Sequence, residues 1–316
     1  MTTASKGRVL LAISGYDPHA WQAAFAGRRD AVLDTDDPHD PTIRYALVWK
    51  QGGSRLRDYP NLKAIFSVGA GVDHLLADPM LPDVPIVRVV DDSLTQPMTE
   101  YVVWRVLDHH RQGVLYRAQQ HDRIWYEPPQ PQAGEVAVGI MGLGELGSAA
   151  ARALPALGYR VNGWSRRPKD LPGVTTFAGT DRLPAFLAAT DILVVLLPLT
   201  PDTRGIIGYG LLRQLRRDNR LGGACLINAG RGGLQKGADI LRALDDGTLK
   251  EATLDVFETE PLPRDSPMWT HPKVFVTPHA AATSDPAHLV PPMIAQMDAF
   301  ERGEPLRNVV DRTAGY

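Results

Sequence analysis

The stretch of sequence that decides the fold runs from Val136 to Arg167 and reads VAVGIMGLGELGSAAARALPALGYRVNGWSRR. Its apolar start, Val136–Met141, is typical of a buried parallel strand, and the small residues from Ser148 onward predict a helix. Between them stands a G-x-G-x-x-G loop made of Gly142, Leu143, Gly144, Glu145, Leu146 and Gly147. This strand–turn–helix setting predicts a site where backbone N–H groups and a helix N-terminus hold a dinucleotide pyrophosphate.

The end of the same stretch bears on which dinucleotide binds. An NAD site usually places Asp or Glu about 20 residues after the loop, at the end of the next strand. Here that strand, Arg160–Trp164, is followed by Ser165, Arg166 and Arg167. A carboxylate would repel a ribose 2′-phosphate, whereas two guanidiniums and a hydroxyl bind one. We expect NADP(H) to be preferred and NAD(H) to bind at lower affinity. The alternative is that the two arginines are a solvated pair on a surface turn.

The composition of the 316 residues argues against several classes of protein. Lys and Arg number 34 against 36 Asp and Glu, so we expect no nucleic-acid or membrane partner. No run of about 20 apolar residues suits a membrane span, and the N-terminus lacks the apolar core of a signal peptide. The single cysteine, Cys225, is expected to be a small buried hydrophobe in a reducing cytoplasm. No metal site is expected, because Cys/His ligand spacing is absent.

Short apolar runs alternate with helical stretches, which indicates parallel sheets joined by crossover helices. A first series of predicted strands comprises Val9–Ile13, Tyr45–Trp49, Ala64–Ser67 and Ile86–Val90. A second series comprises Val136–Met141, Arg160–Trp164, Asp191–Leu197, Ala224–Asn228, Glu251–Asp255 and Val274–Thr277. Two such series predict an α/β protein with two doubly wound, Rossmann-like domains.

The segments between and after these series set the domain boundaries. Apolar residues recur at helical spacing from Thr95 to Gln120 and predict one long helix at the crossing between domains. A further helix is predicted from Ser284 to Gly303 and should return to the first domain. The first domain, flavodoxin-like and substrate-binding, would then be discontinuous, with residues 1–98 and 284–316. The dinucleotide-binding Rossmann domain would be residues 99–283.

Three segments downstream of the glycine loop each follow a predicted strand and bring Arg231, Glu260 and His279. Because ligands bind beyond the carboxyl ends of the strands in an open α/β sheet, these segments should converge on the crevice of the glycine loop. Each residue alone has an ordinary interpretation, as a surface arginine, a capping acid or a satisfied histidine. Their order behind a dinucleotide loop favours a shared catalytic role.

Further motifs extend the pattern over nearly the whole chain. They are Gly69-Ala70-Gly71-Val72-Asp73, Trp164-Ser165-Arg166-Arg167, Leu197-Pro198-Leu199-Thr200, Asn228-Ala229-Gly230-Arg231-Gly232, Leu254-Asp255-Val256-Phe257, Glu260-Pro261-Leu262-Pro263 and Thr277-Pro278-His279. With them the chain resembles the D-isomer-specific 2-hydroxyacid dehydrogenase family, most nearly its glyoxylate/hydroxypyruvate reductase A subfamily. The resemblance implies NADPH-dependent reduction of a small 2-oxoacid by hydride transfer.

The resemblance also implies a role for each matching residue. His279 would protonate the substrate carbonyl oxygen, Glu260 would hydrogen-bond His279 and favour its charged form, and Arg231 would bind the carbonyl oxygen and the carboxylate. Asp255 would hold the carboxamide of the nicotinamide ring. Beyond the glycine loop, the implied cofactor-binding residues are Trp164, Ser165, Arg166, Arg167, Leu197, Pro198, Ala229 and Gly230.

The first domain is implied to contribute substrate contacts. The N–H groups of Ala70 and Gly71 would take the carboxylate as an anion nest, and Trp49 would line the pocket. The turn can equally start a helix, and Trp49 can equally be a core aromatic. The resemblance further implies a homodimer through the Thr95–Gln120 region. A competing hypothesis on the same fold is an NAD(P)(H)-sensing, corepressor-like binding protein, which is disfavoured because long disordered tails are not seen.

Overall fold

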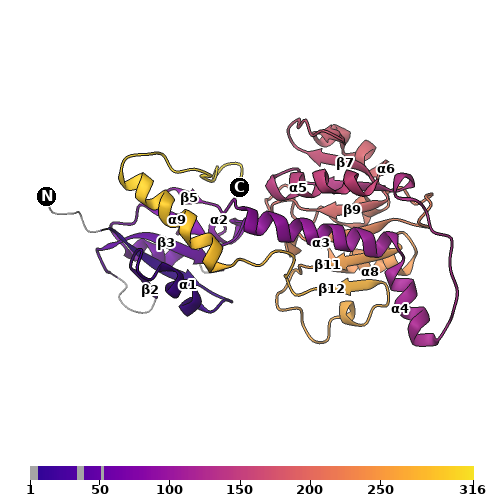
Figure 1. Ribbon diagram of the computed structural model, residues 1–316, viewed down its shortest axis with the longest axis horizontal. Helices are drawn as coiled ribbons and strands as arrows, with labels where there is room; N and C mark the ends of the chain where they lie inside the picture. Colours follow the sequence, from indigo (N-terminus) through magenta and orange to yellow (C-terminus); the bar gives the residue numbers. More distant parts are fainter. Residues whose placement is uncertain (1–5, 34–38, 51–52) are drawn as a thin grey trace. The chain divides into compact units, whose positions relative to one another are not determined.

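The computed structural model describes residues 6–33, 39–50 and 53–316 and divides into two compact units (Figure 1). Unit 1 consists of the described residues up to Leu94 together with Ser284–Tyr316, and unit 2 is Thr95–Thr283. The first boundary between the units falls after Leu94, slightly before the boundary at residue 98 that the sequence predicts. The reason is that Met98 and Tyr101 are buried in a hydrophobic core of unit 2.

Unit 1 contains a five-stranded parallel sheet in the order β2-β1-β3-β4-β5, which is the flavodoxin-like order. Its strands are β1 (Arg8–Ile13), β2 (Ala31–Leu33), β3 (Ile43–Trp49), β4 (Ala64–Ser67) and β5 (Ile86–Val87). Four of them match predicted strands, whereas β2 is too short to show a hydrophobic pattern. The predicted strand Ile86–Val90 ends early, and Val87 makes an antiparallel bridge to Val309.

Helices cover both faces of this sheet. Helices α1 (Pro18–Phe25) and α9 (Pro286–Glu301) lie against each other on one face (Figure 1). The other face is covered by a 3₁₀ helix, Gly53–Asp58, and by α2 (Asp73–Leu76), which share a core with the strands. The predicted helix Ser284–Gly303 is thus confirmed as α9, which begins after Asp285 because that side chain accepts the N–H of Ala287.

A buried arginine fastens α9 to the beginning of unit 1. The Arg29 side chain is fully buried and donates to Asp298 Oδ1 at 2.6 Å and to Glu301 Oε2 at 2.9 Å. It also donates to the carbonyl oxygen of Gly7 at 2.8 Å. Burial alone would raise the pKa of Asp298 and of Glu301, but the bonds from Arg29 hold both below their usual range. Removing one side of such a buried ion pair is strongly destabilising, so the two sequence segments of unit 1 depend on each other.

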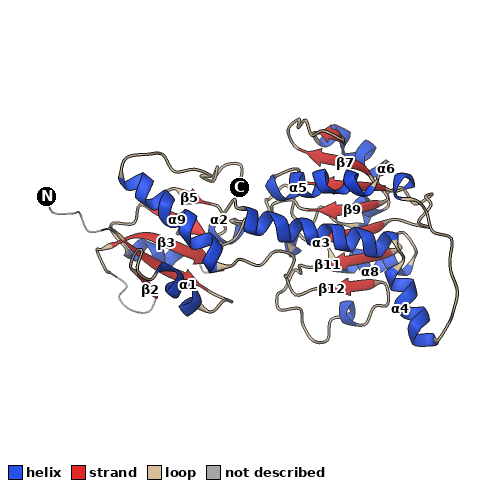
Figure 2. Ribbon diagram, in the orientation of Figure 1, coloured by secondary structure: helices blue, strands red, loops and turns tan. Residues whose placement is uncertain are grey.

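Unit 2 contains a seven-stranded parallel sheet in the order β12-β11-β10-β9-β6-β7-β8. Counted from β6, this is the 3-2-1-4-5-6 order of dinucleotide-binding folds with one strand added at an edge. The strands are β6 (Ala137–Met141), β7 (Arg160–Ser165), β8 (Val174–Ala178), β9 (Ile192–Val195), β10 (Cys225–Asn228), β11 (Glu251–Leu254) and β12 (Val274–Val276). The predicted fold class, two doubly wound α/β domains, is confirmed (Figure 2).

Two hydrophobic cores hold helices on the two faces of this sheet. The helices are α3 (Asp92–His110), α4 (Gly113–Asp122), α5 (Glu145–Ala153), α6 (Leu183–Ala188), α7 (Tyr209–Leu212) and α8 (Gly237–Asp245). Helices α3 and α5 contribute to one core, and α6, α7 and α8 contribute to the other.

The prediction of a single helix over Thr95–Gln120 is wrong. The helix stops at His110 and a second helix starts at Gly113. Between them Gln112 adopts a left-handed backbone with φ of 59°, which a continuous helix cannot accommodate.

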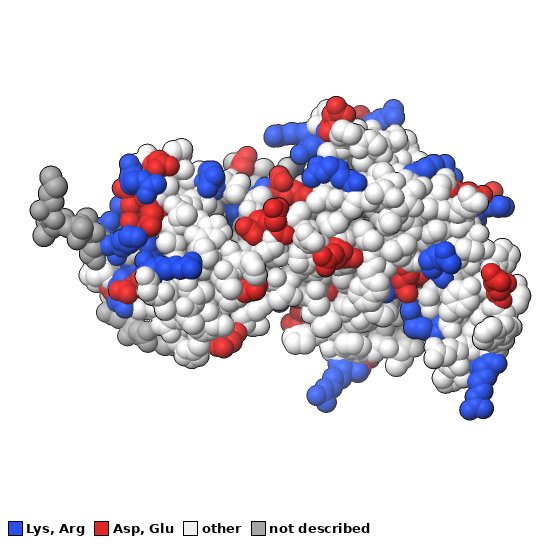
Figure 3. Space-filling view, viewed as in Figure 1, with Lys and Arg blue, Asp and Glu red and all other residues white. Residues whose placement is uncertain are grey.

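On the face shown in Figure 3, acidic and basic side chains are interspersed and neither sign of charge dominates. Among the described residues, no helix has the length and apolar character to cross a membrane.

Most of the large apolar side chains that are exposed among the described residues fall within one short part of the chain. It covers the second half of α3, then α4 and the residues that follow α4. We call them the α3–α4 apolar surface: Trp104, Leu107, Leu115, Tyr116, Ile124, Trp125 and Tyr126.

Candidate active site

The glycine loop joins β6 to α5 at the carboxyl edge of the seven-stranded sheet, where the strand order reverses. Gly142 has φ of +113°, and a Cβ there would lie 2.7 Å from the carbonyl oxygen of Leu196. A Cβ on Gly147 would lie 1.8 Å from the carbonyl oxygen of Gly142. A Cβ on Gly144, in contrast, would meet nothing within 4 Å. The outer glycines therefore permit the tight turn, while the middle one leaves open space at the start of α5, a position suited to a phosphate.

The other three loop residues differ in exposure. Leu143 is buried in the core, and its carbonyl oxygen accepts the Ser148 hydroxyl at 3.0 Å. Leu146 is half-buried and Glu145 is exposed. The backbone of the loop, rather than these side chains, is thus the part suited to holding a phosphate.

The arginine pair lies at the neighbouring strand end. Residue Met141 of β6 pairs with Trp164 of β7, and Gly142 N donates to the Trp164 carbonyl oxygen at 2.9 Å. The indole of Trp164 is buried and donates to Gly179 O at 2.9 Å, so it anchors β7. Ser165 Oγ donates to Arg167 O at 2.7 Å and holds the turn, while the Arg166 and Arg167 side chains are exposed. The two arginines therefore follow the strand that pairs with β6, the strand from which the glycine loop emerges.

Arg231 follows β10 in a tightly tied turn. Asn228 at the end of β10 accepts from Gly230 N at 3.1 Å and donates to Gln235 Oε1 at 2.8 Å. A Cβ on Gly232 would lie 1.8 Å from Phe257 O, so this turn packs directly on the segment after β11. The guanidinium of Arg231 is half-buried and donates to Gly230 O at 2.8 Å. Leu197 and Ala229 are buried beneath the turn, whereas Pro198 is half-buried.

Glu260 and His279 form a hydrogen-bonded pair, with 2.9 Å between Glu260 Oε2 and His279 Nδ1. Their side chains are 22% and 28% exposed, so the pair remains accessible. The other carboxylate oxygen of Glu260 accepts from Phe257 N at 3.2 Å, which fixes its orientation. The Nδ1 atom faces a carboxylate and therefore carries a proton. His279 Nε2 has no hydrogen-bond partner among the described residues, which leaves it available to a substrate.

Asp255 has more partners than the sequence suggested. It is buried, and its Oδ1 accepts from the Thr277 hydroxyl at 2.6 Å and from Ala280 N at 2.8 Å. Its Oδ2 accepts from Ala281 N at 3.1 Å. Because a carboxylate offers about four acceptor positions, one remains for a carboxamide. The hydroxyl of Tyr101 lies 2.6 Å from Thr277 Oγ1. Nothing in the sequence connects a tyrosine of α3 with this strand end.

In unit 1, the turn from Gly69 to Gly71 follows β4. The Ser67 hydroxyl bonds to Gly69 O at 2.9 Å and to Gly71 O at 3.2 Å. No acceptor among the described residues takes the N–H groups of Ala70 and Gly71, and α2 starts soon afterwards. The anion-nest and helix-start interpretations therefore coexist.

The ring of Trp49 packs behind this turn. A Cβ on Gly69 would lie 2.3 Å from it, and its centroid is 5.2 Å from that of His74. With 8% of its surface exposed, Trp49 is mainly a core aromatic.

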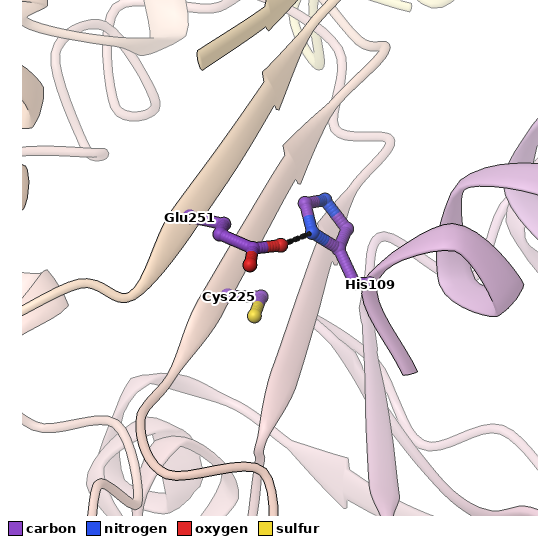
Figure 4. Close-up of side chains that lie close together, drawn as sticks. All are labelled: His109, Cys225 and Glu251. Atoms are coloured by element: carbon purple, nitrogen blue, oxygen red, sulfur yellow. Dashed lines mark hydrogen bonds and ion pairs between the residues drawn. The ribbon is translucent and has the colours of Figure 1, made fainter. Parts of the chain in front are cut away.

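A group of potential metal ligands lies elsewhere in unit 2 (Figure 4). His109 from α3, Cys225 from β10 and Glu251 from β11 are all buried, with one ligand atom of each within 4.8 Å of the others. His109 Nδ1 bonds to Glu251 Oε2 at 2.8 Å, and its Nε2 bonds to Thr253 Oγ1 at 2.9 Å. Burial raises the pKa of the Cys225 thiol, so it stays protonated. Both imidazole nitrogens are used, and the group serves to attach α3 to the sheet.

Comparison with known proteins matches this architecture. The model of the NAD binding domain of D-isomer specific 2-hydroxyacid dehydrogenases matches residues 103–281. A glyoxylate/hydroxypyruvate reductase A from Escherichia fergusonii is 43% identical over 284 residues, which are 88% of this chain and 89% of the relative.

Two solved structures are similar over almost the whole chain. One is an NADPH-dependent glyoxylate/hydroxypyruvate reductase from Sinorhizobium meliloti in complex with NADP and sulfate. It has a TM-score of 0.93 and 47% identity, over 98% of this chain and 100% of that one. The other is a probable 2-hydroxyacid dehydrogenase from Rhizobium etli in complex with NADP, HEPES and L(+)-tartaric acid. It has a TM-score of 0.91 and 45% identity, with the same coverage.

Proposed function

This chain belongs to the D-isomer-specific 2-hydroxyacid dehydrogenase family, and from that premise we propose that it reduces glyoxylate and hydroxypyruvate with NADPH. Its relatives from Escherichia fergusonii and Sinorhizobium meliloti are named for these two substrates. The observation that carries the proposal is the Glu260–His279 pair, 2.9 Å apart and accessible. Glu260 comes after β11 and His279 comes after β12, and both strands belong to the sheet that carries the glycine loop. Carbonyl reduction needs a proton donor, and this pair supplies one.

The residues of unit 2 fit the proposed cofactor. The space at Gly144 and the N-terminus of α5 suit a pyrophosphate, and the exposed Arg166 and Arg167 suit a 2′-phosphate. Asp255 keeps one acceptor position for the carboxamide. When bound, NADPH supplies the hydride.

The chain's own residues then handle the substrate and the proton. His279 Nε2 gives its proton to the carbonyl oxygen as the carbonyl carbon accepts the hydride, and the imidazole is left neutral. The Glu260 carboxylate holds Nδ1–H and stabilises the imidazolium before that transfer. The planar fork of Arg231 is suited to bind the carbonyl oxygen and the carboxylate together. Hydroxyacid oxidation uses the same groups in reverse.

A small 2-oxoacid offers few atoms to recognise, so its carboxylate must provide most of the orientation. We propose that unit 1 contributes the N–H groups of Ala70 and Gly71, which have no acceptor among the described residues. The buried Ser67 holds both neighbouring carbonyl groups and pre-forms this turn. Trp49 braces the turn from behind, and we propose that the small exposed part of its ring borders the substrate.

The proposed function is tested by following NADPH absorbance after addition of 2-oxoacids. We expect oxidation with glyoxylate and with hydroxypyruvate, and a lower kcat/KM with NADH than with NADPH. A panel that includes pyruvate and longer 2-oxoacids defines the substrate range. Absence of turnover with every 2-oxoacid and both cofactors would contradict the proposal.

The preference for NADPH should depend on the two exposed arginines. Replacing Arg166 and Arg167 together by alanine should raise the KM for NADPH by roughly 10-fold or more, because charge-assisted contacts are lost. The KM for NADH, which has no 2′-phosphate, should change little. The matched control replaces Arg213 and Arg217, exposed arginines after α7, and should affect neither cofactor. Equal effects of the first double substitution on both cofactors would show that these arginines do not read the 2′-phosphate.

We propose a homodimer formed through the α3–α4 apolar surface, because this part of the chain exposes several large apolar side chains, and association would remove them from water. Sedimentation at micromolar concentration should then give twice the chain mass of 34.5 kDa. Replacing Leu115 and Trp125 together by glutamate should yield monomers. Trp269→Glu is the control, because Trp269 is 50% exposed but outside this surface. A monomeric native protein at that concentration would rule the dimer out.

We place the proposed reductase activity in the cytoplasm, consistent with the single, unpaired cysteine.

A further inference from the structure

The backbone of His279 has an unusual conformation. Its φ is +55°, in the left-handed region that L-residues other than glycine rarely adopt. Such a residue keeps this conformation only when its surroundings enforce it. His279 directly follows Pro278, whose φ is fixed by its ring. Further contacts must hold His279 and the residues after it.

Asp255 supplies most of those contacts. Its carbonyl oxygen accepts from His279 N at 2.8 Å. Its carboxylate accepts the N–H groups of the next two residues, Ala280 at 2.8 Å and Ala281 at 3.1 Å. The same carboxylate takes the hydroxyl of Thr277, two residues before the histidine, at 2.6 Å. One buried side chain therefore ties the turn on both sides of His279.

Tyr101 adds one more hydrogen bond to this arrangement, and in that bond the tyrosine can only be the donor. The Thr277 hydroxyl gives its single proton to Asp255, so the 2.6 Å contact between Tyr101 and Thr277 must use the proton of the tyrosine. Burial raises the pKa of Tyr101, which therefore keeps that proton at any physiological pH. The result is a chain of donors from α3 through the end of β12 to the end of β11.

We propose that Tyr101, Thr277 and Asp255 form a positioning chain that holds His279 in its left-handed conformation and thereby aims its imidazole. The inference rests on the proposed function, since the imidazole is there the proton donor. None of the three needs to touch the substrate for this purpose. They keep Nδ1 at Glu260 and so direct Nε2 to the reacting oxygen. If the turn relaxed toward the usual right-handed or extended backbone, the imidazole would leave Glu260.

The decisive variant is Thr277→Val, which keeps the shape of the side chain but removes both hydrogen bonds. We expect kcat to fall by about 10²-fold, the loss typical of a catalytic group misplaced by about 1 Å. The Kd of NADPH, measured by fluorescence, should stay within about twofold, because Asp255 retains its backbone donors. Thr277→Ser restores the hydroxyl and should restore kcat. Tyr101→Phe removes only the outer bond and should cause a smaller loss of kcat.

Tyr159→Phe is the matched control for the loss of a buried tyrosine hydroxyl. Tyr159 is as buried as Tyr101, at 5% against 6% exposure, but its hydroxyl bonds to His110 Nδ1 and not to this chain. It should leave kcat unchanged. Thermal unfolding of every variant identifies those that are merely unfolded, and only folded variants are compared.

Nuclear magnetic resonance of ¹⁵N-labelled histidine provides a readout that does not need turnover. In the native protein the Nδ1–H of His279, assigned with His279→Gln, should show the downfield proton of a hydrogen bond to Glu260. Thr277→Val should lose this signal, and Thr277→Ser should keep it.

Thus, if the wild type does not reduce any 2-oxoacid but the signal follows this pattern, the proposed function fails and the positioning chain stands. A folded Thr277→Val protein with native kcat and an unchanged Nδ1–H signal would overturn the positioning chain. A rise in the NADPH Kd with unchanged kcat would also overturn it, since the network would then serve cofactor binding.

Discussion

Replacing His279 by alanine should lower kcat for glyoxylate reduction by at least about 10²-fold, the contribution typical of a general acid. The Kd of NADPH should remain close to that of the native protein, because the predicted cofactor contacts lie in other segments. Stopped-flow measurement with deuterated NADPH shows whether hydride transfer itself is slowed. His288→Ala is the control, since that exposed histidine in unit 1 bonds only to Asp285 at 3.0 Å. Retention of most of the native kcat in His279→Ala would remove this histidine from the mechanism.

Glu260 is expected to contribute through the same histidine. Glu260→Gln keeps the shape of the side chain but removes the carboxylate that lies 2.9 Å from His279 Nδ1. Since that negative charge stabilises the protonated histidine before proton transfer, kcat for glyoxylate reduction should fall, though by less than in His279→Ala. A native kcat in Glu260→Gln, with hydride transfer rate-limiting, would show that the pair does not work in this way.

The second large effect is expected at Arg231. Arg231→Lys keeps the positive charge but loses the planar fork, so kcat/KM for glyoxylate should fall by about 10²-fold or more. The Kd of NADPH should change little. In Arg231→Ala, added guanidinium chloride should restore part of the activity, whereas ammonium chloride should not, because only the former has the fork.

Arg242→Lys controls for the general effect of this exchange. Arg242 lies on α8 and stacks over the ring of Tyr209 at 4.1 Å, without a role in the proposed site. It should retain native kcat/KM. A native value in Arg231→Lys as well would mean that charge alone suffices and that the bidentate contact is not made.

The sequence predicts the sheets well because buried parallel strands are continuous apolar runs. It misses β2, with three residues, and β8, in which Thr175 and Thr176 interrupt the apolar pattern. It also merges α3 and α4, because hydrophobic periodicity continues across the break at Gln112. A left-handed residue leaves no mark on that periodicity.

For the site, the sequence singles out residues that follow strands, but it does not show which neighbours hold them. The separation of Tyr101 from Thr277 in the chain hides their contact, and Asp255 has more bonds than its motif suggests. Trp164 shows that a motif can also point to a residue whose contacts are within the protein. A motif residue beside a cofactor loop turns out to be buried and bonded to Gly179, because motifs do not separate contact residues from supporting ones.

The interrupted course of unit 1 has a consequence for synthesis on the ribosome. Domains generally fold as units while the chain emerges. Unit 2 is continuous and is complete once Thr283 has left the exit tunnel. Unit 1 begins earlier but still lacks α9, and Arg29 has neither Asp298 nor Glu301 to neutralise it. The nascent N-terminal strands must therefore wait while the whole of unit 2 is made, with the part of their sheet that α9 covers still exposed. The unit whose synthesis begins first is completed last.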